Sequence, residues 1–270
     1  MMRKELVYKM DRRDFLKLAA VVGIGGTLAF EGIDKLGAET IEAKRANHTL
    51  QPKHWGMVID IGKFQNAEDF QRVADACHQY HNVPVIDNPN HEVKWIWQED
   101  FEHTFAELES RYLSEEIKTM NYPVLCNHCE NPPCVRVCPT KATFKRPDGI
   151  VAMDYHRCVG CRFCMAACPF GARSFNFYDP RPFIDRVNPE IPTRTKGVVE
   201  KCDFCVERLD KGLNPLCVEA SHGGIIFGDL DDPDSEVRQV LKENFFIRRK
   251  VELGTGPNVF YIFRGGEDIA

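Results

Sequence analysis

Two cysteine-rich stretches near the middle of the chain decide its fold. They read Cys126-x2-Cys129-x4-Cys134-x3-Cys138-Pro139 and Cys158-x2-Cys161-x2-Cys164-x3-Cys168-Pro169, where x stands for any residue. The first stretch has two extra residues between its second and third cysteines, and the spacing is otherwise the same. Both stretches end in Cys-Pro, and Cys138 and Cys168 are 30 positions apart. The two stretches therefore form an internal repeat.

This spacing is the one by which cysteines hold two neighbouring [4Fe-4S] clusters. A C-x2-C-x2-C loop can wrap three corners of a cubane, with its backbone amides turned toward the sulfurs. The fourth cysteine lies on the following helical turn and points to the neighbouring cluster, and the proline helps to end the loop. Zinc and disulfides are the alternatives. Zinc sites use two cysteine pairs per metal, whereas these eight cysteines form two quartets that each end in Cys-Pro, so zinc is disfavoured. Disulfides are also disfavoured, because adjacent C-x2-C runs make poor disulfide frameworks.

The segment between the two stretches predicts a turn and a strand. Pro147-Asp148-Gly149 has the composition of a tight turn. Ile150-Val151-Ala152-Met153-Asp154 follows it and predicts a short strand. Helix, turn, strand and second cysteine run then succeed one another in the order typical of a two-cluster ferredoxin.

A third cysteine run lacks a fourth member. It reads Cys202-x2-Cys205-x11-Cys217-x3-Ser221-His222. Three possibilities are open: Ser221 or His222 is a fourth ligand, the site holds a three-iron cluster, or a cysteine comes from elsewhere. In the last case the cysteine is Cys77, because it is the only one outside the three runs.

The composition of the 270-residue chain agrees with a globular metalloprotein. Apolar residues make up 43% and charged residues 28%, as in folded rather than disordered chains. The formal net charge of −5 argues against nucleic acid as a partner. Twelve cysteines are too few, in a chain of this length, for a small disulfide scaffold.

The N-terminus predicts an export signal. Residues 1–17 carry six basic and three acidic side chains, and a 13-residue, mostly apolar run follows at 18–30. That run has the length of a signal-peptide core and is too short to span a membrane. Asp11-Arg12-Arg13-Asp14-Phe15-Leu16-Lys17 resembles the twin-arginine export motif, with Asp11 in the place of Ser or Thr. We therefore expect a twin-arginine signal region at 1–46 and export of the folded protein; a short amphipathic helix is the alternative.

Ordered matches over nearly the whole chain point to a known family. Besides the two middle cysteine runs, they are Trp55-Gly56-Met57-Val58-Ile59-Asp60, Lys201-Cys202-x-Phe204-Cys205-x2-Arg208 with Gly212 and Pro215, Ile226-Phe227-Gly228-Asp229-Leu230-x-Asp232-Pro233-x-Ser235-Glu236-Val237, and Asn258-Val259-Phe260-Tyr261-Ile262. With them, the chain from about His54 to Phe263 resembles the four-cluster ferredoxin-like electron-transfer subunits of bacterial and archaeal respiratory membrane complexes. The resemblance implies an α+β fold of tandem bacterial-type ferredoxin-like [4Fe-4S] modules, with short strands, small helices and long loops. It also implies one-electron transfer without catalysis of a substrate reaction.

In this family an N-terminal quartet follows the first strand and ends in Ala-Cys, with Asn-Val-Pro beyond it. Here Ala76-Cys77 precedes Asn82-Val83-Pro84, so Cys77 resembles the remaining fourth cysteine of that quartet. The places of the other three hold apolar residues: Val73, Phe70 and Ala67 by ferredoxin spacing, and Phe64 for the first cysteine when counted from the strand. None of these can be a ligand.

Residues 66–80 predict a helix in place of the lost ligand loop. Asn66 suits the N-cap, and Glu68 and Asp69 suit the first turn. Apolar residues recur at helical spacing at positions 67, 70, 73, 74 and 77. Cys77 then lies near the end of a helix rather than in a loop.

The resemblance also implies which cysteines share a cluster, because the family's fourth cysteines ligate the cluster of the partner quartet. The implied ligand sets are Cys126, Cys129, Cys134 and Cys168 for cluster 1, Cys158, Cys161, Cys164 and Cys138 for cluster 2, and Cys202, Cys205, Cys217 and Cys77 for cluster 3. The family's fourth cluster has no ligands left here. The first three cysteines of the N-terminal quartet are replaced, and Ser221 stands in the place of its fourth ligand. Three [4Fe-4S] clusters then use all twelve cysteines. A structural Cys77 beside a three-iron or Ser/His-ligated third site is the alternative.

The same pairing implies the domain organisation. Residues 126–197 are expected to form a two-cluster module. Residues 47–125 and 198–270 are expected to form a second unit, in which a degenerate N-terminal ferredoxin module pairs with the third cysteine run.

Four basic residues lie beside cysteines in the sequence: Arg157, Arg162, Lys201 and Arg208. A positive charge near a cluster stabilises its reduced, more negative form. A solvated surface position is the alternative for each of them.

An exported, three-cluster member of the family resembles the extracytoplasmic iron–sulfur subunit of membrane complexes linked to dissimilatory sulfite reduction (Dsr), including the Hdr-like menaquinol-oxidising complex. This implies as partners a multi-span quinone-interacting membrane subunit, a haem b subunit, a multi-haem cytochrome c and a heterodisulfide-reductase-like subunit. It also implies a location at the extracytoplasmic face of the cytoplasmic membrane, held there by partner subunits. The alternatives are an electron-relay subunit of a molybdenum-containing reductase and a zinc-binding interaction module.

Overall fold

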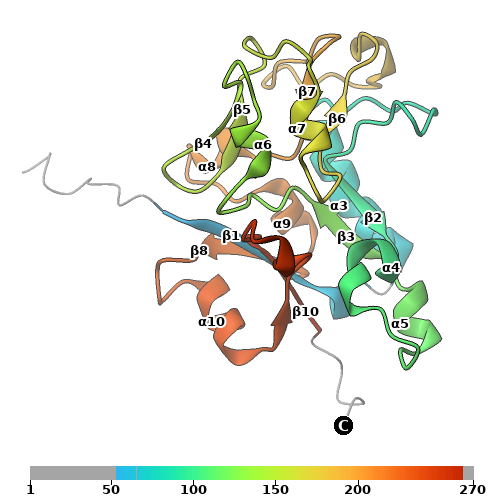
Figure 1. The fold of residues 1–270 in the computed structure, drawn as a ribbon, viewed down its shortest axis with the longest axis vertical. Helices are drawn as coiled ribbons and strands as arrows, with labels where there is room; N and C mark the ends of the chain where they lie inside the picture. The colour runs from blue at the N-terminus through green and yellow to red at the C-terminus, as the bar shows by residue number, and fades with distance from the viewer. Residues whose placement is uncertain (1–52, 65, 264–270) are drawn as a thin grey trace, which may run out of the picture. The chain divides into compact units, whose positions relative to one another are not determined.

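A four-stranded sheet with the order β8-β1-β10-β9 joins the N-terminal and C-terminal parts of the described chain (Figure 1). The computed structural model describes residues 53–64 and 66–263, so the expected signal region at 1–46 lies outside the described residues. The strands are β1 (Trp55–Asp60), β8 (Ile225–Asp229), β9 (Phe246–Ile247) and β10 (Val259–Ile262). β1 is parallel to β10 and antiparallel to β8, and Met57 lies opposite both Val259 and Phe227.

Both faces of this sheet are buried, because successive side chains of a strand point to opposite sides. Met57 and Ile59 of β1 face the main core. Val58, between them, faces α10 (Glu236–Glu243), from which Val237 and Val240 cover the sheet. Met57, Val58 and Ile59 are each 0% exposed. The unbroken apolar run of β1 is therefore that of a central strand.

The helix predicted for residues 66–80 is present as α3 (Ala67–Tyr80). Asn66 is its N-cap, as predicted, and accepts the N–H of Asp69 at 3.0 Å. Phe70, Val73, Ala74 and Cys77 are buried, whereas Ala67 in the first turn is exposed. α3 packs against α9 (Leu216–Ala220), and Arg72 Nε donates a hydrogen bond to the carbonyl of Ala220 at 2.8 Å.

An antiparallel strand pair leads into the first cysteine run. It consists of β2 (Ile96–Glu99) and β3 (Tyr122–Leu125), and Cys126 directly follows β3. Three short helices lie between the strands: α4 (Phe101–Thr104), η2 (Ala106–Leu108) and α5 (Glu115–Thr119). Phe105 packs edge-to-face on Tyr122 and on Tyr261 of β10, with ring centroids 5.4 and 5.2 Å apart. This aromatic contact fixes the strand pair to the sheet.

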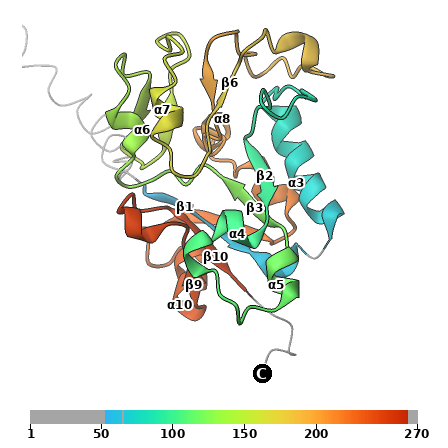
Figure 2. The same ribbon diagram turned by 45° about the vertical axis from the view of Figure 1, so that its right-hand side comes forward.

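Short elements follow the two middle cysteine runs. The first run contains α6 (Pro133–Arg136), and β4 (Thr143–Lys145) and β5 (Val151–Met153) come after it. The second run contains α7 (Phe163–Ala166), and β6 (Ser174–Phe175), η3 (Arg181–Phe183) and β7 (Val199–Glu200) come after it. β4 pairs with β5 and β6 with β7, both antiparallel. Figures 1 and 2 show α6 and α7 side by side, far from α10. The predicted turn and strand are confirmed: Gly149 has a φ of +85° and β5 follows it.

The other helices are η1 (Ile61–Lys63), α8 (Val206–Leu209) and η4 (Val251–Leu253). The mixture of short strands and small helices agrees with the expected α+β class. Within residues 53–64 and 66–263, no helix has the length and apolar character needed to cross a membrane.

Replacing Asn66 by Ala removes the cap of α3 and leaves the N–H of Asp69 without its partner. We expect the free energy of unfolding to fall by about 1 kcal/mol, seen as a lower melting temperature by circular dichroism. Asn66→Ser keeps an oxygen at the cap and should melt close to the wild type. Equal melting of the Ala and Ser variants would show that the cap does not stabilise α3.

Candidate iron–sulfur sites

All twelve cysteines lie within the described residues, and all are free thiols. Cys161 is exposed, Cys138, Cys158 and Cys168 are half-buried, and the other eight are buried. The disulfide alternative therefore finds no support in the described residues.

The structure brings Cys77 next to the third cysteine run. Burial raises the pKa of Cys77, and negative charge on Cys205, Cys202 and Cys217 raises it further, because these sulfurs lie close together. Cys77 belongs to α3 and Cys217 to α9, so the packing of these two helices sets their approach. These are the four residues that the resemblance assigns to cluster 3.

Ser221 and His222 have other surroundings. Ser221 Oγ donates to the carbonyl of Val218 at 2.7 Å and accepts the N–H of Ile225 at 2.8 Å, so its hydroxyl links α9 to β8. His222 is exposed. Beside Ser221, where the resemblance implies a lost cluster, the packing is apolar: Phe64 is buried, and a Cβ on Gly224 would lie 3.0 Å from its ring.

A second group combines the first cysteine run with the last cysteine of the second run. Burial raises the pKa of Cys129 to about 12, and negative charge on Cys126, Cys134 and Cys168 contributes to the shift. The approach of Cys168 to the other three is the crossed arrangement that the resemblance assigns to cluster 1. His128, between the first two cysteines, is buried and accepts the N–H of Val151 at Nδ1, which is a structural role.

The third group lines a single cavity. Its walls include Cys138, Cys158, Cys161 and Cys164, the set that the resemblance assigns to cluster 2. Gly160 has a φ of +67°, and a Cβ there would lie 2.3 Å from the carbonyl oxygen of Gly197, so this loop requires glycine. Burial raises the pKa of Cys138, but hydrogen bonds from Thr143 and its neighbours outweigh burial and lower it.

We call the three groups a row, because the group of Cys126 neighbours both of the others. Besides burial, charge on Cys134 raises the pKa of Cys164, and charge on Cys126 raises that of Cys202. The group of Cys126 therefore has the other two as neighbours. Buried thiolates crowded in this way repel one another, and iron bound to them compensates their charge. The residues present thus fit iron–sulfur clusters.

Arg173, which the sequence patterns did not single out, lies between two of these groups. It is 5% exposed, and Nη2 donates to Cys134 Sγ at 3.1 Å while Nη1 donates to Thr143 Oγ1 at 3.2 Å. Burial alone would lower the pKa of Arg173, but negative charge on Cys134, Cys164 and Cys126 outweighs burial and raises it. A buried cation needs a counter-charge. In the described part of the chain, cysteine sulfurs supply it.

The basic residues singled out from the sequence fall into two classes. Arg157 and Arg208 form ion pairs with neighbouring carboxylates, and Arg162 is exposed. Lys201 is buried, and its Nζ donates to the carbonyl of Cys202 at 2.7 Å. Adjacency in sequence therefore identified one buried cation and missed Arg173, whose approach depends on tertiary packing.

Comparison with known proteins agrees with this geometry. A family model described as a 4Fe-4S dicluster domain matches residues 117–179. The chain is 40% identical to the Hdr-like menaquinol oxidoreductase iron-sulfur subunit 1 of Archaeoglobus fulgidus, over 96% of this chain and 100% of the relative. It is 45% identical to a tetrathionate reductase subunit of Salmonella typhimurium, over 93% of this chain and 88% of the relative. It is 35% identical to the menaquinone reductase iron-sulfur cluster-binding subunit of Nitratidesulfovibrio vulgaris, over 78% and 89%.

The chain belongs to the family of iron–sulfur electron-transfer subunits of respiratory oxidoreductase complexes. Within this family it is similar, over 96% of its length, to an Hdr-like menaquinol oxidoreductase subunit. The function predicted from the sequence, electron transfer by an iron–sulfur subunit, is thereby confirmed.

Replacing Arg173 by Gln removes the cation that contacts Cys134. We expect the reduction potential of the adjacent cluster to fall, because the reduced, more negative form loses a stabilising charge. A tenfold change in this one-electron equilibrium corresponds to about 59 mV, which a redox titration followed by electron paramagnetic resonance (EPR) would measure. Arg173→Lys keeps the charge, and Arg162→Gln changes an exposed charge, so both should shift the potential less. An unchanged potential in Arg173→Gln would contradict this role.

Proposed function

We propose that this chain relays single electrons through three [4Fe-4S] clusters in a membrane-bound, menaquinol-oxidising complex of the Dsr or Hdr-like type. The observation that carries the proposal is the row of three cysteine groups with four cysteines in each. Each cluster, when bound, supplies a carrier for one electron. The likeness to the Archaeoglobus fulgidus subunit over its whole length supports the link to menaquinol.

The proposed ligand sets are those implied by the resemblance. They are Cys126, Cys129, Cys134 and Cys168 for cluster 1, Cys158, Cys161, Cys164 and Cys138 for cluster 2, and Cys202, Cys205, Cys217 and Cys77 for cluster 3. The proximities support these sets. We propose the order cluster 2, cluster 1, cluster 3, because charge on Cys134 acts on Cys164 and charge on Cys126 acts on Cys202.

We further propose the module division predicted from the sequence. Residues 126–197 would hold clusters 1 and 2 as a tandem ferredoxin-like module. Residues 47–125 and 198–270 would pair to hold cluster 3. The pairing of β1 with β8 and β10, and the packing of α3 on α9, support the second unit.

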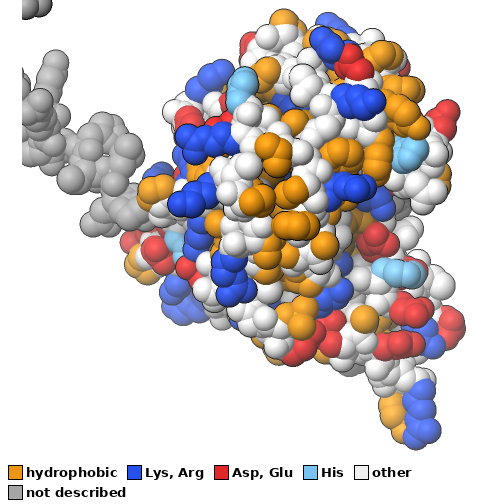
Figure 3. Space-filling view, turned by 45° about the horizontal axis from the view of Figure 1, so that its top comes forward, with side chains coloured by type: hydrophobic (Ala, Val, Ile, Leu, Met, Phe, Trp, Pro, Cys, Tyr) orange, Lys and Arg blue, Asp and Glu red, His pale blue; other side chains and the backbone are white. Residues whose placement is uncertain are grey.

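The surface around cluster 2 is proposed to receive a redox partner. Cys161 is exposed there, and its apolar neighbours Val159 and Phe163 are 68% and 59% exposed. Four basic residues in or next to the same two cysteine runs are exposed: Arg136, Lys141, Arg157 and Arg162. Figure 3 shows the molecule with the top of Figure 1 turned forward. On this face, hydrophobic side chains, which in the figure include cysteine, are interspersed with Lys and Arg. A partner protein with an apolar contact surface and an acidic rim would complement this face.

The proposed partners are those of the Dsr and Hdr-like complexes: a multi-span quinone-interacting subunit, a haem b subunit, a multi-haem cytochrome c and a heterodisulfide-reductase-like subunit. The proposed location is the extracytoplasmic face of the membrane, reached by the twin-arginine route. The likeness to the tetrathionate reductase subunit supports a second candidate, an electron-relay subunit of a molybdenum-containing reductase. The proteins that purify with the chain discriminate: a molybdopterin subunit favours the second candidate.

Cys77→Ala tests the ligand set of cluster 3. We expect the wild type to bind about twelve irons per chain, and Cys77→Ala to lose about four of them, because three [4Fe-4S] clusters are reduced to two. Iron analysis and the visible spectrum measure this. Ser221→Ala and His222→Ala should keep all the iron, and a loss in either would favour a Ser- or His-ligated third site. A Cys77→Ala variant with full iron, or a colourless protein loaded with zinc, would contradict the proposal.

Val159→Gln tests the surface around cluster 2. The change removes exposed apolar contact area without altering charge, so the cluster potential should stay as it is. We expect about tenfold slower reduction of the clusters by menaquinol in membranes, because association with the partner is weakened. Val85→Gln is the matched control, since Val85 is 66% exposed but far from these cysteines in sequence. Equal rates in the two variants would place the contact elsewhere.

A further inference from the structure

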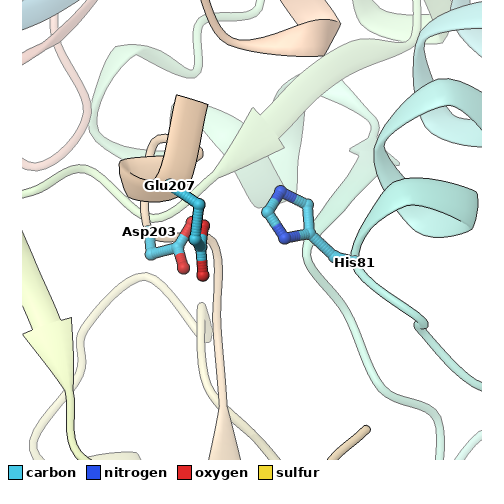
Figure 4. Close-up of side chains that lie close together, drawn as sticks. All are labelled: His81, Asp203 and Glu207. Atoms are coloured by element: carbon cyan, nitrogen blue, oxygen red, sulfur yellow. The ribbon is translucent and has the colours of Figure 1, made fainter. Parts of the chain in front are cut away.

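A group of metal-ligating side chains lies beside Cys205, outside the cysteine groups. It consists of His81 at the end of α3, Asp203 in the loop before Cys205, and Glu207 in the first turn of α8. One nitrogen or oxygen atom of each residue lies within 4.8 Å of those of the other two. Figure 4 shows an edge of the imidazole ring facing the two carboxylates.

His81 is held with one ring nitrogen free. It is 1% exposed, its ring stacks on Trp95 with centroids 4.2 Å apart, and Nε2 lies 3.1 Å from Cys205 Sγ. A cysteine sulfur that binds metal accepts hydrogen bonds, so Nε2 carries the proton and Nδ1 keeps its lone pair. Within the described chain, the buried Nδ1 has no hydrogen-bond partner. Such an atom is costly unless it binds something.

The carboxylates also need a positive charge close by. Asp203 is 7% exposed, and Glu207 Oε2 is buried without a hydrogen-bond partner among the residues that the structure describes. Lys201 and Arg194 act on Asp203 electrostatically, yet no cationic group of the described residues lies within 4.0 Å of either carboxylate. Cys205 is next to both acids and is negative when it binds a cluster. The local negative charge is therefore only partly compensated.

We propose that His81, Asp203 and Glu207 bind one divalent transition-metal ion of the Mn²⁺ or Zn²⁺ type, through Nδ1 and one oxygen of each carboxylate. Imidazole nitrogen and carboxylate oxygen are donors for both ions, with bonds to Zn²⁺ of about 2.0–2.2 Å. The three ligand atoms, which lie within 4.8 Å of one another, must move closer to share one ion, and Glu207 is half-buried in the first turn of the short helix α8. The imidazole then links the ion to Cys205.

This site goes beyond the proposed electron relay, but it rests on the proposed third cluster, because the lone pair on Nδ1 of His81 follows from Cys205 being a metal ligand. Its positive charge offsets the two acids at the buried end of the row. Because the bond to the ion and the hydrogen bond to Cys205 use opposite nitrogens, one imidazole serves both.

Binding of Mn²⁺ to the cluster-loaded protein tests the site. Mn²⁺ prefers oxygen and nitrogen to thiolate, so it does not compete for the cysteines. We titrate Mn²⁺ alone and follow the free ion by EPR. We expect one bound Mn²⁺ per chain in the wild type and binding about tenfold weaker in Glu207→Gln. Glu236→Gln is the matched control, since it changes an exposed acid in the first turn of α10, and it should bind like the wild type.

Two further measurements keep the outcome decisive. Iron content, determined on the same samples, should be equal in all three proteins, and its absence from the wild type would contradict the proposed relay rather than this site. Pulsed EPR of Mn²⁺ bound to the wild type should show coupling to one nitrogen, which His81→Gln removes. Three results would each overturn the proposal: no stoichiometric binding of Mn²⁺, equal binding by Glu207→Gln and the wild type, or no nitrogen coupling in the wild type. In that case a protonated carboxyl group, rather than an ion, relieves the negative charge.

Discussion

The packing of α3 on α9 is the contact on which the C-terminal half of the metal-binding arrangement depends. It brings Cys77 to Cys217, although 140 positions separate them in the sequence. The hydrogen bond from Arg72 to Ala220 and the buried side of α3 hold the two helices together. The same contact places His81, just beyond α3, against Cys205. α3 and the residue that follows it thus supply one cysteine and one histidine to the surroundings of the third cysteine run.

Local features were predictable from the sequence because they depend on neighbouring residues. The turn at Pro147-Asp148-Gly149, the strand β5 and the helix α3 with its Asn66 cap follow from turn chemistry, capping and spacing. The approach of Cys77 to the third run could be expected from the family resemblance, and the structure places it there. These features agree because local preference and tertiary packing favour the same conformation.

Other features depend on contacts that no local pattern records. Arg173 carries no periodic or motif signal, and only tertiary packing brings it to Cys134. His81 follows the end of a helix in a run of polar residues, so its contact with Cys205 was not foreseen. The neighbours of β1 also could not be read from its apolar run, because its partners lie about 170 to 200 positions away. Ala67 fitted the apolar spacing of α3 but lies in an exposed first turn.

Charge is distributed unevenly along the row of cysteine groups. The group with the exposed Cys161 can be stabilised by water, whereas the group of Cys77 is buried throughout. Adding an electron to a buried cluster places negative charge in a medium of low polarity, which disfavours reduction. Arg173 counters this effect in the middle of the row, and Asp203 and Glu207 act in the opposite sense at the buried end. Because each group consists of four cysteines, environment rather than residue type distinguishes the three groups.

The parallel pairing of β1 with β10 also constrains the order in which the molecule can form. During synthesis the two middle cysteine runs are complete once residue 168 has been made, and their eight cysteines lie within residues 126–168. β1 gains β10 only after residue 262 has been added, and the group of Cys77 needs residue 217. Long-range pairing of this kind is slow to form, because a large loop must close first. The local groups can therefore assemble early, while closure of the sheet marks the point at which nearly the whole chain is present.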